Sequence, residues 1–252
     1  MNFFVVLGAY NEEKGIGALL KNLVKIHQGR LPELKVLIVN DGSHDRTSEI
    51  ARSFANQIPL ELIEFNQNRG IVEVFRTAFQ KVVEQAKDND YCITMDADNT
   101  HPPEVIFKII EKLRQGDDIA IASRFEPDGG VVGAPPFRAF LSNTVAFLLQ
   151  RIVGIPGVKD YSTFYRGYRV SLLRKGLAVY GDSLVAGEGF AGMAGLLIRL
   201  SHLTRNIGEV ALVLRYDLKE GRSGMKIYRT TLGYFKLFAQ HLRGQLRPSR
   251  IV

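Results

Sequence analysis

Short apolar runs alternate with segments of helical spacing along the first half of the chain. Runs typical of buried strands occur at residues 3–7, 35–39, 60–65, 91–95 and 118–123. Apolar positions at helical spacing predict helices at residues 14–27, 45–54, 70–86 and after the proline pair 102–103. Repeated strand–helix units of this kind predict an α/β fold, with a mostly parallel central sheet flanked by helices.

The pattern changes after residue 125. Residues 126–136 are rich in Gly and Pro and predict a mobile loop. Residues 137–155 then place apolar side chains on a wide helical face, which suits either a core helix or a helix lying on lipid. No run of about 18 uncharged apolar residues occurs, so no membrane span is predicted. The stretch 184–198 comes closest, but Glu188 and several glycines interrupt it.

Polar side chains gather where the predicted strands end. Ligands of open α/β sheets bind at the carboxyl ends of the strands, so these side chains are candidates for one site. Each cluster alone is also typical of an ordinary turn, because turns favour Asp, Asn and Gly. Their presence on successive strand ends favours a functional site. The clusters are residues 10–13, 40–43, 96–98 and 123–124.

The segment TMDADNTHPPE, residues 94–104, places two carboxylates one residue apart directly after an apolar run. On an extended strand, positions i and i+2 face the same side about 7 Å apart. Asp96 and Asp98 are therefore expected to point together at the exposed end of the strand. Two like charges so placed repel each other unless a positive charge lies between them. The sequence thus predicts a divalent cation at this pair.

The composition suits one globular domain with a sizeable core, since 46% of the 252 residues are hydrophobic and 23% are charged. The single cysteine, Cys92, lies in a predicted strand and cannot form a disulfide within the chain. A reducing, cytoplasmic compartment is therefore expected. The first residues carry no basic region ahead of the apolar run, so no signal peptide is expected.

The net charge of +7 is concentrated at one end of the chain. Residues 215–252 contain nine Lys or Arg and two acids, so they carry the whole excess and residues 1–214 sum to zero. A neutral body with a basic tail indicates an anionic partner, such as a membrane or a phosphorylated substrate, although a solvated basic helix has the same composition. No base-reading or RNA-binding motif accompanies the tail, so nucleic acid is not expected as a partner.

The order of these motifs resembles that of a known enzyme family. The strings are YNEE, NDGS, MDAD followed by HPPE, SRF followed by a glycine loop and Arg138, YSTFYRGYR, and EVALVLRYDLKEGRS. Together they resemble the polyprenyl-phosphate sugar synthases, which are glycosyltransferases of family 2 similar to dolichol-phosphate mannose synthase. The resemblance implies a GT-A type nucleotide-sugar-binding fold over residues 1–226, followed by a basic amphipathic helix or tail over residues 227–252.

The resemblance also implies a nucleotide-sugar donor at the strand ends. Mg²⁺ or Mn²⁺ would be held by Asp96 and Asp98, with the Thr100 hydroxyl as an additional ligand, because these ions prefer hard oxygen donors. Two groups of side chains would contact the nucleotide, one lining its pocket and one clamping its diphosphate. The first group is Tyr10, Asn11, Glu12, Asp41 and Asp96, and the second is Arg215, Lys219 and Ser223.

The implied acceptor is a lipid monophosphate held by Arg124 and Arg138, because the guanidinium fork bonds phosphate bidentately. Such a phosphate is already anionic near neutral pH, with a second pKa near ~6, so no catalytic base is expected. Asp160 and Glu188 are interpreted instead as residues that position loops and arginines. Direct attack of phosphate on the sugar implies inversion, with catalysis by alignment and charge stabilisation at Asp96, Asp98 and the two arginines.

The expected reaction moves a hexose from a nucleotide sugar of the GDP-mannose or UDP-glucose type to polyprenyl or dolichyl monophosphate. We expect the protein to act peripherally, on the cytoplasmic face of the membrane. The sequence departs from the family pattern at Gly8-Ala9 before the first motif, at Thr100, and at Gly224, where a lysine is usual. The third departure leaves open whether Arg222 or Lys226 replaces that lysine.

Three alternatives remain at this point. The string DADNT also fits the nucleophile motif of haloacid-dehalogenase-type phosphatases, but that motif is normally near a chain's start and is not followed by His-Pro-Pro. A family 2 transferase with a non-lipid acceptor is the second alternative. The third is a non-catalytic protein that binds nucleotide sugars, or serves as a membrane adaptor, on the same fold.

Overall fold

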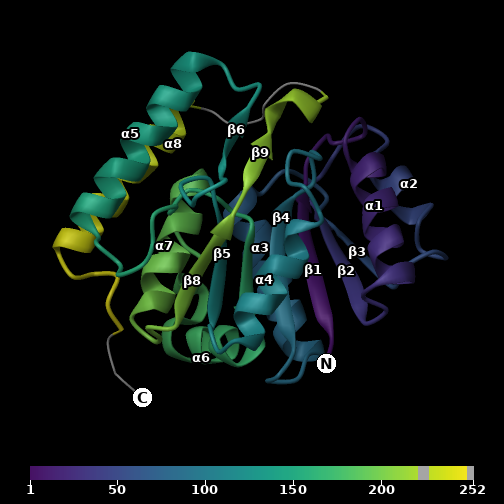
Figure 1. Cartoon of the computed structure of the whole chain (residues 1–252), viewed down its shortest axis with the longest axis horizontal. Coiled ribbons are helices and arrows are strands. Elements are labelled where there is room, and N and C mark those ends of the chain that lie inside the picture. Colours follow the sequence, from purple (N-terminus) through teal and green to yellow (C-terminus); the bar gives the residue numbers. More distant parts are fainter. Residues whose placement is uncertain (221–226, 249–252) are drawn as a thin grey trace.

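The computed structural model describes residues 1–220 and 227–248, apart from the side chains of residues 138–139 and 227–229. Its elements run from β1 at the N-terminus to α8 near the C-terminus (Figure 1). In chain order they are β1 (Phe3–Ala9), α1 (Ile16–Gly29), β2 (Leu34–Asn40), α2 (Thr47–Arg52), β3 (Leu60–Glu64), α3 (Ile71–Gln85), β4 (Tyr91–Asp96), α4 (Val105–Arg114), β5 (Ile119–Ser123), β6 (Gly130–Val132), α5 (Pro136–Ile152), β7 (Arg166–Arg169), α6 (Val170–Tyr180), η1 (Gly181–Leu184), α7 (Gly189–Ser201), β8 (Ile207–Ala211), β9 (Val213–Arg215), η2 (Tyr216–Leu218) and α8 (Ile227–Leu242).

The main sheet has seven strands in the order β3-β2-β1-β4-β7-β5-β8. All neighbouring strands are parallel except β7, which runs antiparallel between β4 and β5. The predicted α/β class, with a mostly parallel sheet flanked by helices, is confirmed. The carboxyl ends of β1, β2, β4 and β5 therefore meet at one edge of the sheet, where the sequence placed its polar clusters.

Alternate residues of β1 supply the two faces of the core. Phe3, Val5 and Leu7 pack on the side covered by α1, α2 and α4. Phe4 and Val6 pack on the side covered by α3, α6 and α7. Each strand of a sheet covered on both faces is apolar at consecutive positions, which explains the continuous apolar runs in the sequence. In β4, the chain's only cysteine, Cys92, is fully buried.

Two short strands depart from the expected pattern. β6 lies inside the stretch 126–136 that was expected to be a mobile loop, and it pairs in parallel with β9 from the far end of the chain. β7 has only four residues, which is too short for a period to be recognised, and it forms within the string YSTFYRGYR. Both strands are specified by partners distant in sequence, so local pattern could not predict them.

The helix α5 is an exposed element rather than a core helix. Among its described side chains only Ala146 and Leu149 are buried, whereas Phe137, Phe140 and Phe147 are 65–70% exposed. In Figure 1, α5 lies at the outer edge of the molecule in front of α8. Of the two alternatives for this segment, the exposure disfavours a core helix, and its placement on lipid stays a prediction.

The helix α8 packs along α7 while leaving part of its surface exposed. It buries Tyr234, Leu237 and Phe238 in the core cluster on the α7 side. Its exposed large apolar side chains are Leu232, Phe235 and Leu242. Among the described residues, no helix combines the length and the apolarity that crossing a bilayer requires.

Candidate active site

Asp98 lies in the turn that follows β4. The strand ends at Asp96, so the expected strand spacing does not reach Asp98. Instead, Asp98 Oδ1 accepts hydrogen bonds from the Thr100 backbone N–H at 3.1 Å and from the Thr100 hydroxyl at 2.7 Å. The Cα–C=O backbone of Asp98 packs so tightly on the start of α1 that a Cβ at Gly15 would lie 3.0 Å from the Asp98 carbonyl group. These contacts fix the Asp98 side chain, which is 10% exposed.

Lys219 directly follows η2, far from Asp98 in sequence but close to it in the fold. Its ammonium group forms an ion pair with Asp98 Oδ2. Burial alone would raise the pKa of Asp98, but the charge of Lys219 and the hydrogen bonds from Lys219 and Thr100 hold it below its ordinary value. Burial acts to lower the pKa of Lys219, yet the charge of Asp98 raises it, so the ammonium stays charged. The sequence predicted Lys219 for the diphosphate but gave no sign of this carboxylate partner.

Asp96 is held by a histidine that sequence reasoning left without a role. The Asp96 backbone N–H donates to His101 Nδ1 at 3.0 Å, and His101 Nε2 lies 3.7 Å from Asp96 Oδ2. His101 is buried and stacks on Tyr165 with a ring separation of 4.9 Å. Partial burial raises the pKa of Asp96; His101 and Lys219 oppose this rise and Asp98 adds to it. The Asp96 side chain is 32% exposed, so it faces solvent while Asp98 does not.

The first two strand ends are joined by hydrogen bonds. The Asn11 backbone N–H donates to the Ser43 hydroxyl at 2.9 Å, and Asn11 Oδ1 accepts from the His44 backbone N–H at 2.9 Å. Asn11 adopts a left-handed backbone with a φ of 55°, which asparagine tolerates better than most residues. Beside it, Tyr10 is 40% exposed. The YNEE and NDGS motifs thus form one surface, as the sequence predicted.

Glu12 connects that surface to the β4 aspartates. Its backbone N–H donates to the Thr47 hydroxyl at 2.9 Å, and its carbonyl accepts from Ile16 at the start of α1. Burial raises the pKa of Glu12 to about 7; the charges of Asp98, Asp96 and Asp45 add to this rise, and Lys219 opposes it. Glu12, Asp96 and Asp98 therefore lie within electrostatic range of one another, with Lys219 among them.

Asp41 is buried at the end of β2 and bonds to the loop before α3. Its two carboxylate oxygens accept the backbone N–H groups of Arg69 at 2.6 Å and Gly70 at 2.9 Å. The neighbouring Gly42 has a φ of +71°, and a Cβ there would lie 2.5 Å from the Gln67 backbone. Asp41 thus shapes the loop 66–70, and its contact with a base or ribose stays a prediction.

Arg124, after β5, forms a buried two-pronged ion pair with Asp160. Arg124 Nε lies 2.7 Å from Asp160 Oδ2, and Arg124 Nη2 lies 2.8 Å from Asp160 Oδ1. The same guanidinium donates to the hydroxyls of Ser142 at 2.9 Å and Ser162 at 2.6 Å. Burial acts to raise the pKa of Asp160, but Arg124 holds it below its ordinary value. The interpretation of Asp160 as a residue that positions an arginine is in accord with this geometry.

Glu209 on β8 supports the same pair and was missed by sequence reasoning. Glu209 Oε1 accepts the backbone N–H groups of Lys159 at 2.8 Å and Asp160 at 2.9 Å. Because Glu209 fixes the backbone at Asp160 and Asp160 fixes Arg124, three elements far apart in sequence determine where the guanidinium lies. The only sequence signal was the acid that opens the string EVALVLRYD.

The structure describes the remaining predicted site residues only in part. Arg215 donates its backbone N–H to the Thr100 carbonyl at 3.0 Å, while its guanidinium pairs with Asp217 at 2.8 and 2.7 Å. The backbone of Arg138 lies in the first turn of α5, but its side chain is outside the described part of the chain. Ser223, together with Arg222, Gly224 and Lys226, also lies outside the described residues.

The donor groups at the end of β4 fit a divalent cation. Asp96 and Asp98 supply the hard carboxylate oxygens that Mg²⁺ and Mn²⁺ prefer. Across residues 1–220 and 227–248, no group of three or more His, Cys, Asp or Glu side chains is arranged to hold a metal ion. Two carboxylates suit a cation that completes its coordination with substrate oxygens and water, as Mg²⁺ does with nucleotide phosphates. The Thr100 hydroxyl donates to Asp98, so it orients that carboxylate whether or not it also serves as a ligand.

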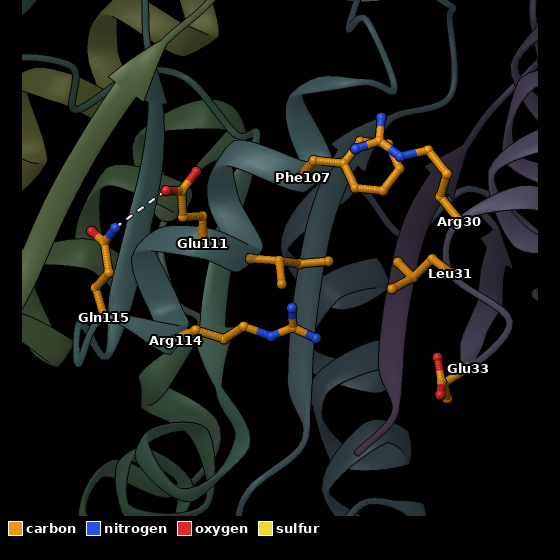
Figure 2. Close-up of a pocket in the computed structure, with 8 residues that line it drawn as sticks. Arg30, Leu31, Glu33, Phe107, Glu111, Arg114 and Gln115 are labelled. Atoms are coloured by element: carbon orange, nitrogen blue, oxygen red, sulfur yellow. Dashed lines mark hydrogen bonds between the residues drawn. The ribbon is translucent and has the colours of Figure 1, made fainter.

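A separate hollow lies away from this edge of the sheet (Figure 2). It measures about 510 Å³ and lies between the segment after α1 and the helix α4. Arg30 stacks on Phe107 at 3.9 Å, and Arg114 lies 5.6 Å from the ring of Phe3, the first residue of β1. The hollow is thus near the amino ends of the strands and is not part of the carboxylate site.

Comparison with known proteins gives the same assignment as the motifs. The family model described as "Glycosyl transferase family 2" matches residues 4–177. Dolichol-phosphate mannosyltransferase of Pyrococcus furiosus is 31% identical over 168 residues, which cover 67% of this chain and 45% of that protein. Polyprenol monophosphomannose synthase of Mycolicibacterium smegmatis is 26% identical over 248 residues, which cover 98% of this chain and 89% of that protein. The chain thus spans about half the length of the first relative and most of the second.

The fold is also similar to a solved structure. Glucosyl-3-phosphoglycerate synthase from Mycobacterium tuberculosis, in complex with Mn²⁺, uridine diphosphate and glucosyl-3-phosphoglycerate, matches with a TM-score of 0.65 and 16% identity. The match covers 96% of this chain and 79% of the other. The expected GT-A type fold is confirmed.

Proposed function

This chain belongs to glycosyltransferase family 2, and on that basis we propose that it transfers a hexose from a nucleotide sugar to a polyprenyl monophosphate. The observation that carries the proposal is the cluster of Asp96, Asp98, Glu12 and Lys219 at the carboxyl edge of the sheet. Three carboxylates and one ammonium at this edge suit a metal-bound diphosphate. The two relatives whose names specify mannose and a polyprenyl or dolichyl phosphate support the same substrate classes.

On the donor side, the protein would bind and orient the diphosphate. Asp98, fixed by Thr100, and the more exposed Asp96 would hold Mg²⁺ or Mn²⁺, which when bound supplies Lewis-acid stabilisation of the departing nucleoside diphosphate. Lys219, and Arg215 from the same segment, would add positive charge beside that group. Tyr10 and Asn11 lie at the exposed end of β1, where they can line the nucleotide pocket.

On the acceptor side, the protein would hold a phosphate that needs no deprotonation. A lipid monophosphate is largely dianionic near pH 7 and can attack the anomeric carbon directly, which implies inversion. The two acids that could be mistaken for a base are both engaged. Asp160 pairs with Arg124, and Glu188 pairs with Lys236 of α8. Arg124 and Arg138 would bind the phosphate and align it with the anomeric carbon of the donor.

We propose that the surface formed by α5 and α8 contacts the membrane that contains the acceptor. The two helices touch where His241 bonds the backbone at Ile152. Their exposed faces carry the aromatic and aliphatic side chains Phe137, Phe140, Phe147, Leu148, Leu232, Phe235 and Leu242. Basic residues at Arg151, Lys236, Arg243 and Arg247 are interspersed with them. Apolar and basic side chains on one face suit an interfacial helix pair on anionic lipid.

The test is a transfer assay with the full chain. The protein would be incubated with labelled GDP-mannose or UDP-glucose, a polyprenyl monophosphate, and Mn²⁺ or Mg²⁺. We expect a polyprenyl monophosphosugar with inverted anomeric configuration, and no product from an Asp98→Asn variant. A parallel incubation with soluble glycans tests the non-lipid acceptor. Product on a glycan alone, or binding without transfer to any acceptor, would contradict the proposal.

A further inference from the structure

Both oxygens of the Asp98 carboxylate are engaged by the protein itself. Oδ1 accepts from the Thr100 N–H and hydroxyl, and Oδ2 is bonded to the Lys219 ammonium. The Asp98 side chain is 10% exposed and the Lys219 side chain is 16% exposed, so solvent screens this ion pair little. The Lys219 ammonium therefore occupies the Asp98 oxygen that would otherwise bind a metal ion.

Lys219 is anchored close to that position by its own segment. Its backbone N–H bonds the Tyr216 carbonyl at 3.2 Å, and Arg215 bonds the Thr100 carbonyl at 3.0 Å. A Cβ at Gly133, in the loop after β6, would lie 2.7 Å from the Asp217 backbone nitrogen, so this loop packs closely on η2. The backbone segment that carries Lys219 is thus bonded to the turn that carries Asp98. A change in the side-chain torsions of Lys219 is then enough to move its ammonium group off the carboxylate.

We propose that Lys219 excludes free divalent cations from Asp98 until a nucleoside diphosphate gives its ammonium group another anion to bind. The inference rests on the proposed function and deepens it. A divalent ion arriving alone must displace a positive charge that has no other carboxylate ion pair among the described residues. A diphosphate accepts that charge, so Lys219 turns from Asp98 to phosphate and frees the carboxylate oxygen.

The consequence is strong mutual dependence of metal and nucleotide binding. Each ligand should raise the affinity of the other by the same factor, because coupling between two binding equilibria is reciprocal. Lys219 is then a positioning residue with two successive partners, Asp98 and the diphosphate. In the absence of donor, its pairing also offsets the repulsion among Asp98, Asp96 and Glu12.

The experiment measures Mn²⁺ binding directly, by electron paramagnetic resonance of free Mn²⁺, with and without GDP or UDP. The full chain would be compared with Lys219→Met, Lys219→Arg and a matched surface control, Lys108→Met. We expect the wild type and the control to bind Mn²⁺ at least about tenfold more tightly with nucleotide than without. Lys219→Met should bind Mn²⁺ alone at least about tenfold more tightly than the wild type and lose most of the nucleotide effect. Lys219→Arg, which keeps the charge, should retain most of the coupling.

The outcomes separate the two proposals. If the wild type shows nucleotide-dependent Mn²⁺ binding but Lys219→Met binds Mn²⁺ alone no more tightly, the role of Lys219 is overturned and the proposed function stands. If the wild type binds no Mn²⁺ even in the presence of GDP or UDP, the proposed metal-dependent function itself is contradicted. Circular dichroism of each variant verifies folding, and Lys219→Gln serves as a second neutral variant if Lys219→Met does not fold.

Discussion

The guanidinium of Arg124 and the carboxylate of Asp160 face each other in a two-pronged ion pair, with Nε–Oδ2 and Nη2–Oδ1 distances of 2.7 and 2.8 Å. Asp160 is fully buried and Arg124 is 10% exposed. A buried pair with this geometry fixes the Arg124 side chain, but it leaves an uncompensated charge when one partner is removed. The stability of the fold and the position of the candidate phosphate-binding arginine are therefore linked.

Asp160→Asn should lower the free energy of unfolding by about 3–5 kcal/mol, because Arg124 loses its buried counter-ion. Urea unfolding followed by circular dichroism measures the change. Asp88→Asn is the matched control, since Asp88 pairs with Arg174 at 2.8 Å on the surface, where the two side chains are 71% and 44% exposed. That change should cost less than about 1 kcal/mol. Equal losses in the two variants would contradict the structural role of Asp160.

The same pair should make stability depend on pH in the acid range. Because Arg124 lowers the pKa of Asp160 in the folded state, the stabilisation is fully present above the unfolded pKa of about 3.9. It is lost as pH falls through the folded-state pKa of Asp160. The difference in unfolding free energy between wild type and Asp160→Asn should thus shrink as pH falls below about 4. A difference that stays constant over this range would argue against the lowered pKa.

Asp98→Ala should abolish transfer and weaken metal-dependent donor binding, because Asp98 is a candidate metal ligand whose carboxylate Thr100 holds in place. Calorimetry with the nucleoside diphosphate, with and without Mn²⁺, should show a loss of at least about 100-fold in the Mn²⁺-dependent affinity. Asp182→Ala, on η1 away from the strand ends, should leave that affinity unchanged. Retention of the metal effect in Asp98→Ala would remove Asp98 from the set of metal ligands.

Arg138→Ala should raise the Michaelis constant for lipid phosphate while leaving donor affinity nearly intact. Loss of one bidentate phosphate contact should cost on the order of 1.5–3 kcal/mol, which is roughly 10- to 150-fold. Arg151→Ala, at the other end of α5, is the control for removing a basic side chain from this helix. If donor affinity falls as far as acceptor affinity, Arg138 contacts the diphosphate instead.

Flotation with anionic liposomes tests the surface formed by α5 and α8. Deleting the tail would expose Tyr234, Leu237 and Phe238, so point variants are the better probe. Replacing Arg243 and Arg247 by Glu should greatly reduce binding at low salt, because each basic residue near an anionic surface contributes about 1 kcal/mol.

The matched charge control replaces Lys21 and Lys25 of α1 by Glu, which changes the net charge equally on an exposed helix of the opposite flank (Figure 1). That control should float like the wild type. The double change Phe140→Ser and Phe147→Ser should weaken binding at high salt as well, since it removes apolar area rather than charge. Equal flotation of all variants would show that this surface does not contact lipid.

The sequence predicted the longer apolar strands and the helices that alternate with them in the first half of the chain. The strands β1 to β5 and the helices α1 to α3 lie within two residues of the expected bounds, because the strands are continuous apolar runs and the helical segments place apolar residues at a period of 3.6. β6, β7 and β9 have three or four residues each and depend on partners elsewhere in the chain, so no local pattern could reveal them. The polar clusters directly follow these strands in the sequence, so their order along the edge of the sheet was predictable once the strands were recognised.

The candidate site was predictable in its members but not in its contacts. Asp98 and Lys219 are 121 positions apart, and Arg124 and Asp160 are 36 positions apart, so only the folded chain reveals either pair. His101 and Glu209 act by holding Asp96 and the Asp160 backbone, and neither role leaves a periodic or compositional mark. Motif order identifies which side chains meet, whereas long-range packing determines which of them bond.

The burial of Cys92 makes this protein suitable for labelling at chosen positions. The chain's only thiol is fully inaccessible in β4, and burial raises its pKa far above the ordinary value, so a thiol-directed probe finds no reactive thiolate in the native protein. A cysteine introduced at Leu218, which is 42% exposed, would then be the single labelled position. A spin label or fluorophore there would report the departure of the neighbouring Lys219 from Asp98 as donor is added. In a separate variant, a single cysteine at Phe147 would report contact with lipid.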